Sequence, residues 1–217
     1  MSRDNRDLKC KDIVAGVVEA TIEQIPVVNF FTSAILKAKE GCLRRRFDNW
    51  QKMINERLAT LEDAVFNTIG DNETFATTLL KATELASISN NKKMGYIANA
   101  VKYTAENDVD EDSLIIMLNC ISKYTNSHIL ILKYLENPAL FSDGKDYMGG
   151  GVFTYFDKHY SDFNSQLKTI ILQDLYRDGL VTIGSDAIMT KSGMEAKRTT
   201  NLGDLFITIF GIENENQ

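Results

Sequence analysis

The sequence predicts a mainly α-helical protein, in which a multi-helix bundle is followed by a small α+β module. Only 2 of the 217 residues are proline, against an average usage of about 5%, and proline interrupts helices strongly. Four of the 13 glycines lie in residues 1–142, and the other nine lie in the last 75 residues. Apolar residues recur at helical spacing through most of the first part of the chain.

Six or seven helices are predicted before residue 140. The pattern leaves open whether Gly41 interrupts it, and the clearest predicted helix begins just after this glycine. Pro26 fits the first turn of an earlier helix. The clearest helix has apolar residues three or four positions apart, namely Leu43, Phe47, Trp50, Ile54, Leu58, Leu61 and Val65. The predicted ranges are 8–25, 26–40, 43–65, 72–88, 92–106, 111–124 and 127–136.

Capping residues mark several helix ends. Gly70 stands where a left-handed C-terminal cap is expected, and Asn72 is a candidate N-cap for the next helix. The acids within residues 108–112 favour a helix N-terminus. They also imitate the first ligands of an EF-hand, but that loop would need glycine in place of Ser113 and glutamate in place of Asn119. We therefore reject calcium binding in that mode.

A Gly-rich segment, residues 142–151, marks a change in organisation. It holds four glycines, and we interpret it as a flexible linker. It separates a helical bundle, residues 1–141, from a second module, residues 152–217. Its glycines and Lys145 stand in the wrong order for a phosphate-binding P-loop, and no strand precedes them.

The second module opens with a predicted helix from Asp162 or Asn164 to residue 178, and Gly179 is its expected cap. A final apolar helix is predicted within residues 199–211. The side chains expected to face inward from the first of these helices are Leu167, Ile170, Ile171 and Leu175.

Residues 172–193 resemble the second half of a winged-helix domain. In that family a helix ends in a Gly-Leu-Val step, enters a β-hairpin wing and leaves through a Thr-x-x-Gly step. Short predicted strands at residues 180–183 and 187–190 agree with such a wing. Thr190 can cap the outgoing helix. The step from Thr200 to Gly203 is a second candidate exit, with which the hairpin would be longer and the closing helix would span residues 201–210. The resemblance is carried by Leu172, Leu175, Gly179, Leu180, Val181, Thr190 and Gly193.

The winged-helix resemblance implies DNA binding, and the charge of the module argues against it. Residues 143–217 contain 7 Lys and Arg against 11 Asp and Glu, a net charge of −4 within a chain of net charge −6. Phosphate binding depends on positive charge, so we expect structural or protein-binding use instead. The side chains available to contact DNA or a partner are Asn164, Gln166, Lys168 and Arg177.

The layout is also similar to a loose group of uncharacterised bacterial and prophage-encoded helical-bundle proteins. The shared features are an amphipathic start with an Ile-Pro-x-Val turn at residues 25–28 and a Thr-x-Leu-Gly-x-x-Phe segment at residues 200–206. The group shares a basic helix entry as well. This resemblance implies a prophage or phage-defence locus and supplies no catalytic residues.

Two features suggest charged or membrane contacts. Arg44, Arg45 and Arg46 form the most basic part of the chain and could meet phosphates of nucleic acid or lipid. We interpret them instead as the solvated side of the helix at residues 43–65. Residues 13–36 could be a membrane-active amphipathic segment, but Glu19 and Glu23 weaken attraction to anionic lipid, and two core helices are the preferred interpretation.

Motifs for metal or cofactor chemistry are missing from the sequence. The three cysteines are far apart and form no Cys-x-x-Cys pair, as expected of reduced thiols in a cytoplasm. His128 and His159 lack a carboxylate or cysteine at ligand or triad spacing, and the first residues do not read as a signal peptide. Neither a cofactor nor a metal is expected.

The predicted function is therefore non-catalytic: a cytoplasmic protein-interaction module that binds a protein partner or self-associates. Two alternatives stay open. The first is a winged-helix DNA-binding transcriptional regulator, and the second is a membrane-perturbing effector that uses residues 13–36.

Overall fold

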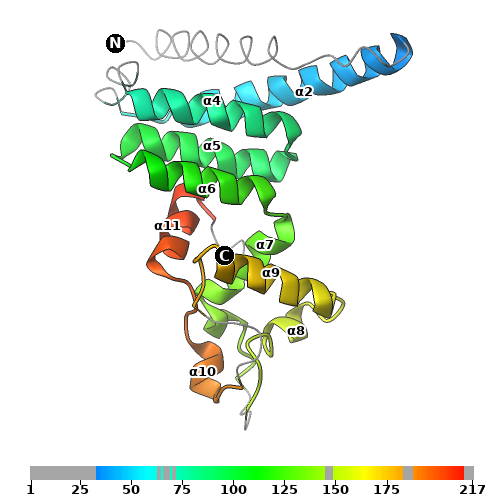
Figure 1. Ribbon diagram of the computed structural model, residues 1–217, viewed down its shortest axis with the longest axis vertical. Coiled ribbons are helices and arrows are strands. Elements are labelled where there is room, and N and C mark those ends of the chain that lie inside the picture. The colour runs from blue at the N-terminus through cyan, green and yellow to red at the C-terminus, as the bar shows by residue number, and fades with distance from the viewer. Residues whose placement is uncertain are drawn as a thin grey trace. The chain divides into compact units, whose positions relative to one another are not determined.

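A computed structural model of the chain describes residues 33–62, 65, 69, 72–144, 149–182 and 188–212. The side chains of residues 33–40, 42 and 43 are outside this description. The described part is mainly helical, as predicted. Its contacts group into two compact units, residues 1–122 and residues 123–217, and each is described separately below (Figure 1).

Several predictions lie outside the described residues. They are the helix at residues 8–25, the first part of the helix at 26–40, the cap at Gly70 and the segment 13–32. The linker predicted at residues 142–151 is described only in part and stays a prediction. The contact grouping instead divides the chain after Ser122, so the helix that follows belongs to the second unit.

The first unit is built around one long helix, α2 (Ser33–Leu58), which continues through Gly41 without a break. Its inward stripe matches the predicted one, because the side chains of Phe47, Trp50, Ile54 and Leu58 are buried. The helix ends seven residues before the predicted end at residue 65, yet Leu61 is still buried in the turn that follows.

Three further helices complete the described part of the first unit: α4 (Glu73–Ile88), α5 (Asn91–Glu106) and α6 (Glu111–Lys123). Their ends use the local chemistry expected of caps. Asn72 accepts a hydrogen bond from the backbone N–H of Phe75, and Asn90 caps α5 in the same way. The Asp110 carboxylate accepts the N–H of Ser113 at the start of α6.

Helix α2 packs against both α4 and α5, which run side by side (Figure 1). A buried hydrogen bond fixes the level at which α2 meets α4, since Trp50 Nε1 donates to Thr83 Oγ1 over 3.0 Å. Trp50 and Thr83 are both fully buried, so this bond satisfies the indole N–H that burial would otherwise leave without a partner.

The second unit contains a central helix, α7 (Asn126–Glu136), which packs against α9 (Ser165–Arg177) and α11 (Asn201–Phe210). Shorter helical turns surround them: η2 (Pro138–Phe141), α8 (Phe156–His159) and α10 (Lys191–Glu195). The core is rich in aromatic side chains, with Tyr134, Tyr155, Phe156, Phe206 and Phe210 fully buried. Burial raises the pKa of Tyr134, whose hydroxyl donates to the carbonyl of Val152 over 2.6 Å.

The predicted β-hairpin is not supported. Among the described residues there is no strand, and only two isolated antiparallel bridges occur. Val181 pairs with Thr199 and Met189 pairs with Gly150, so the two predicted strands each bridge to another segment. The turn predicted between them, residues 184–186, is outside the described residues. The winged-helix part of the fold prediction is therefore corrected to a helical unit with two bridges.

Both threonines that competed as the start of the closing helix act as N-caps. Thr190 accepts the N–H of Gly193 in the short helix α10, and Thr200 accepts the N–H of Gly203 in α11 over 3.0 Å. Gly203 also lets α11 lie close to the backbone of Leu180, because a Cβ atom at position 203 would lie 2.1 Å from the Leu180 carbonyl oxygen. The Thr-x-Leu-Gly step at residues 200–203 is thus explained by packing.

The prediction for the faces of α9 was half right. Ile171 and Leu175 are buried, whereas Leu167 and Ile170, also expected to face inward, are exposed. The inward stripe includes Lys168 instead. Gly179 ends the helix as predicted, with a left-handed φ of 74°.

Candidate functional site

The three consecutive arginines have separate roles in the structure. Arg46 Nη1 donates to the carbonyl of Ser87 over 3.0 Å, at the C-terminal end of α4. A cation there complements the negative end of the helix dipole. Arg44 and Arg45 are exposed, and Arg45 also bonds the carbonyl of Gly41 one turn back. The structure therefore does not gather all three side chains on one phosphate-binding face.

The predicted contact residues of the second unit lie on α9 and are largely engaged within the chain. Asn164 is the N-cap of α9 and accepts the N–H of Leu167 over 3.1 Å. Lys168 is buried and forms an ion pair with Asp157. Arg177 pairs with Asp174 one turn back on the same helix.

Lys168 is held on two sides. Its ammonium bonds Asp157 and lies 5.7 Å from the ring centroid of Phe153, a cation–π arrangement. The buried lysine thus completes the inward face of α9 and is not available to a nucleic acid. Gln166, the fourth predicted contact residue, is exposed, and its side chain takes part in none of the contacts described above.

The solvent-facing side of α9 carries exposed apolar side chains among polar ones. The side chain of Ile170 is 54% exposed, that of Leu167 is 41% exposed and that of Tyr176 is 54% exposed. Gln166 and Gln173 are exposed on the same helix. We call these five residues the α9 outer face. Arg177, whose side chain is 71% exposed, lies on the same side of the helix, two turns after Ile170.

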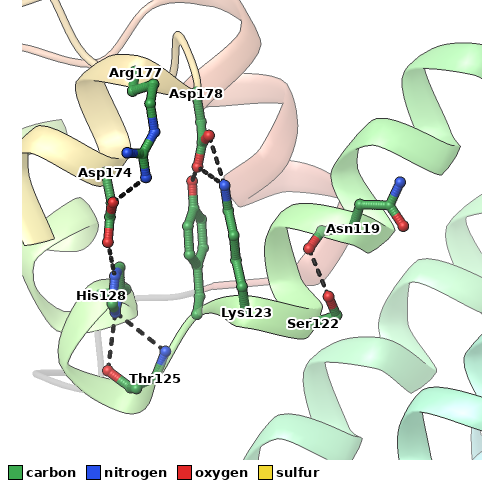
Figure 2. Close-up of polar contacts among 9 residues, drawn as sticks. Asn119, Ser122, Lys123, Thr125, His128, Asp174, Arg177 and Asp178 are labelled. Carbon is green, nitrogen blue, oxygen red and sulfur yellow. Dashed lines mark hydrogen bonds and ion pairs between the residues drawn. The ribbon is translucent and has the colours of Figure 1, made fainter.

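A polar network joins the start of α7 to the end of α9 (Figure 2). His128, in the first turn of α7, points its Nε2 atom at Asp174 Oδ2 over 3.4 Å. Its Nδ1 atom accepts the backbone N–H of Thr125 over 3.2 Å and lies 2.9 Å from the Thr125 hydroxyl oxygen. Because Nδ1 is the acceptor, the neutral ring carries its proton on Nε2, facing Asp174.

Tyr124 and Lys123 attach the same turn to Asp178, the residue that ends α9. The Tyr124 hydroxyl donates to Asp178 Oδ2 over 2.5 Å, and Lys123 Nζ lies 2.6 Å from the same carboxylate. The Tyr124 ring stacks on the imidazole of His128, with centroids 4.9 Å apart and planes 10° apart. Tyr124 and His128 are both buried.

The pKa of His128 is lowered from its ordinary value. Burial is the main cause, while the Asp174 and Asp178 carboxylates act in the opposite direction and Lys123 adds to the lowering. The imidazole is therefore neutral at physiological pH, in agreement with the hydrogen bond that Nδ1 accepts.

The order hydroxyl, imidazole and carboxylate in Thr125, His128 and Asp174 is that of a nucleophile, base and orienting acid. Its contacts favour a structural role. The lone pair of Nδ1 is shared with the backbone N–H of Thr125, and Arg177 occupies the other oxygen of Asp174. The arrangement is that of a capping box, with His128 in the place usually taken by Glu or Gln.

The pairing of His128 with Asp174 could not be predicted from sequence, because 46 residues separate them. A local signal for the capping box was present in the Thr-x-x-His spacing of residues 125–128. Within the described ranges, no group of three potential metal ligands occurs. Among the described helices, none is both long and apolar enough to cross a membrane. Comparison of the chain with known protein families, with curated proteins and with solved structures finds no match.

Proposed function

We propose that the chain is a non-catalytic cytoplasmic interaction protein, and that its second unit binds another protein through the α9 outer face. The observation that carries this proposal is the exposure of Ile170, Leu167 and Tyr176 on one helix. Several exposed apolar side chains on one helix are a feature of binding surfaces.

The charges on α9 support a protein partner over a nucleic acid. Lys168 is buried against Asp157, and Arg177 is 71% exposed but paired with Asp174. DNA affinity depends mainly on several cations that reach phosphates, and the exposed side of α9 offers Arg177 among neutral amides and apolar groups. The fitting partner is a mainly apolar surface, such as one side of an amphipathic helix, that accepts Ile170 and Leu167.

Site-specific photocrosslinking tests this proposal. A benzophenone amino acid is placed at Ile170 in the full chain, expressed in its native cell, and a second chain carries it at Lys52, whose side chain is 76% exposed on α2. We expect a protein adduct of discrete mass from position 170 and none of that mass from position 52.

A matched variant links the adduct to the apolar face. Replacing Leu167, whose side chain is 41% exposed, by Gln in the Ile170 probe chain removes apolar contact and keeps a good helix former. We expect at least a fivefold loss of the adduct from a chain that still folds, as circular dichroism checks. Adducts to nucleic acid, or equal adducts from both probe positions, would contradict protein binding by the α9 outer face. An adduct of twice the chain mass would identify the partner as a second copy.

A further inference from the structure

The first turn of α7 is closed by an imidazole where other helices use a carboxylate or an amide. Thr125 donates its backbone N–H to Nδ1 of His128 over 3.2 Å. Glu or Gln in this position accepts the same bond at any pH above the acid range. Histidine accepts it only while neutral, because protonation turns Nδ1 into a donor.

Protonation of His128 removes the bond that closes the turn. Nδ1–H can then donate to the Thr125 hydroxyl oxygen, 2.9 Å away, but Nδ1 can no longer accept the Thr125 backbone N–H. The ring is buried and stacked on Tyr124, so it has little room to turn away within the closed structure. The Thr125 N–H is then left without its acceptor, so the first turn of α7 loses the bond that closes it.

The charged groups around His128 are balanced in pairs. From α9, Asp174 and Asp178 face the ring, and each is bound by a cation: Arg177 for the former and Lys123 for the latter. Of the other elements packed against α7, α11 contributes only Asp204, which is bound to Lys197, and η2 carries no ionisable side chain. Carboxylate attraction alone therefore does not hold a proton on the closed ring.

We propose that His128 makes the start of α7 a pH-sensitive latch: the neutral ring closes the first turn and holds it to the end of α9, and the protonated ring releases it. The residues attached to Asp178, namely Lys123 and Tyr124, immediately precede the turn. Release of the turn loosens their contacts as well.

Hydrogen exchange of the Thr125 amide, followed by NMR in the full chain, tests the latch directly. The protection factor corrects for the intrinsic pH dependence of exchange. We expect it to fall at least tenfold between pH 7.5 and pH 4.5, in step with protonation of the His128 ring.

Two variants separate the latch from general acid effects. His128→Gln supplies an amide that accepts the Thr125 N–H without titrating, so its protection factor should change less than twofold over the same range. His159→Gln removes the other histidine, which is exposed on α8, and should keep the wild-type fall. A constant Thr125 protection factor in the wild-type chain over the full range, or an equal fall in His128→Gln, would overturn the proposal.

Discussion

Gly203 and Gly95 give opposite predictions for the same substitution. Both lie inside helices, Gly203 in the first turn of α11 and Gly95 in α5. Alanine is favoured over glycine in a helix by about 1 kcal/mol, so each Gly→Ala change carries a similar intrinsic gain. What differs is the space that the new methyl group enters.

At Gly203, a Cβ atom would lie 2.1 Å from the carbonyl oxygen of Leu180 and 3.2 Å from the Cβ of Thr199. The oxygen belongs to the backbone and accepts the N–H of Thr200 over 3.0 Å, so moving it also strains that bond. Overpacking costs about 1–3 kcal/mol, and a weakened hydrogen bond adds roughly 1 kcal/mol. After the helix gain is subtracted, we expect Gly203→Ala to lower the free energy of unfolding by about 1–3 kcal/mol.

At Gly95, no atom lies within 4 Å of the added Cβ. Gly95→Ala should therefore raise the free energy of unfolding by about 0.5–1 kcal/mol. Urea unfolding followed by far-UV circular dichroism measures both variants. Fluorescence of Trp50, the only tryptophan in the chain, reports separately on the first unit. A Gly203→Ala protein as stable as the wild type would refute the close packing of α11 on Leu180.

Three further changes probe the buried bond, the helix cap and the imidazole. Trp50→Phe removes the indole donor to Thr83 and leaves a cavity in the core, so it should lower the unfolding free energy by about 2–3 kcal/mol, measured by urea unfolding; no loss would contradict the bond. Asn164→Ala removes the side chain that caps α9 and should cost about 1 kcal/mol, whereas Asn164→Asp should retain most of the stability. The pKa of His128 in the folded chain lies below its value in the unfolded chain. The unfolded chain therefore binds the proton first, and stability falls as pH drops below about 6.5. His128→Gln should reduce this loss in melting experiments at different pH, and an unchanged loss would contradict the role of His128.

Local chemistry in the sequence predicted helix ends well. Asn72 caps α4, Gly179 ends α9 with a positive φ, and Thr190 and Thr200 both cap helices. Each of these roles depends on residues within four positions of the cap, so a single stretch of sequence contains the whole signal.

Predictions that depended on distant partners were less successful. The strand at residues 180–183 was placed in a hairpin, but Val181 bridges to Thr199, 18 residues away. The inward face of α9 was shifted because Lys168 takes a buried position that an isolated sequence assigns to solvent. Its burial depends on Asp157 and Phe153, which the helical period of α9 does not contain.

The candidate site shows the same division. The Thr-x-x-His spacing at residues 125–128 is local, whereas the carboxylate that faces His128 comes from Asp174 on another helix. The exposure of Ile170 likewise depends on which side of α9 meets α7. Both features follow from tertiary packing, which overrides the local pattern.

The most direct test of protein binding by the α9 outer face is the accessibility of Ile170 in the cell. A cysteine is introduced there and its rate of maleimide labelling is read peptide by peptide in the purified chain and in its native cells, with Lys52→Cys as the matched surface control. We expect the cysteine at position 170 to react at least fivefold more slowly in cells, while position 52 reacts at the same rate in both. Equal labelling of position 170 in both settings would contradict the proposed binding.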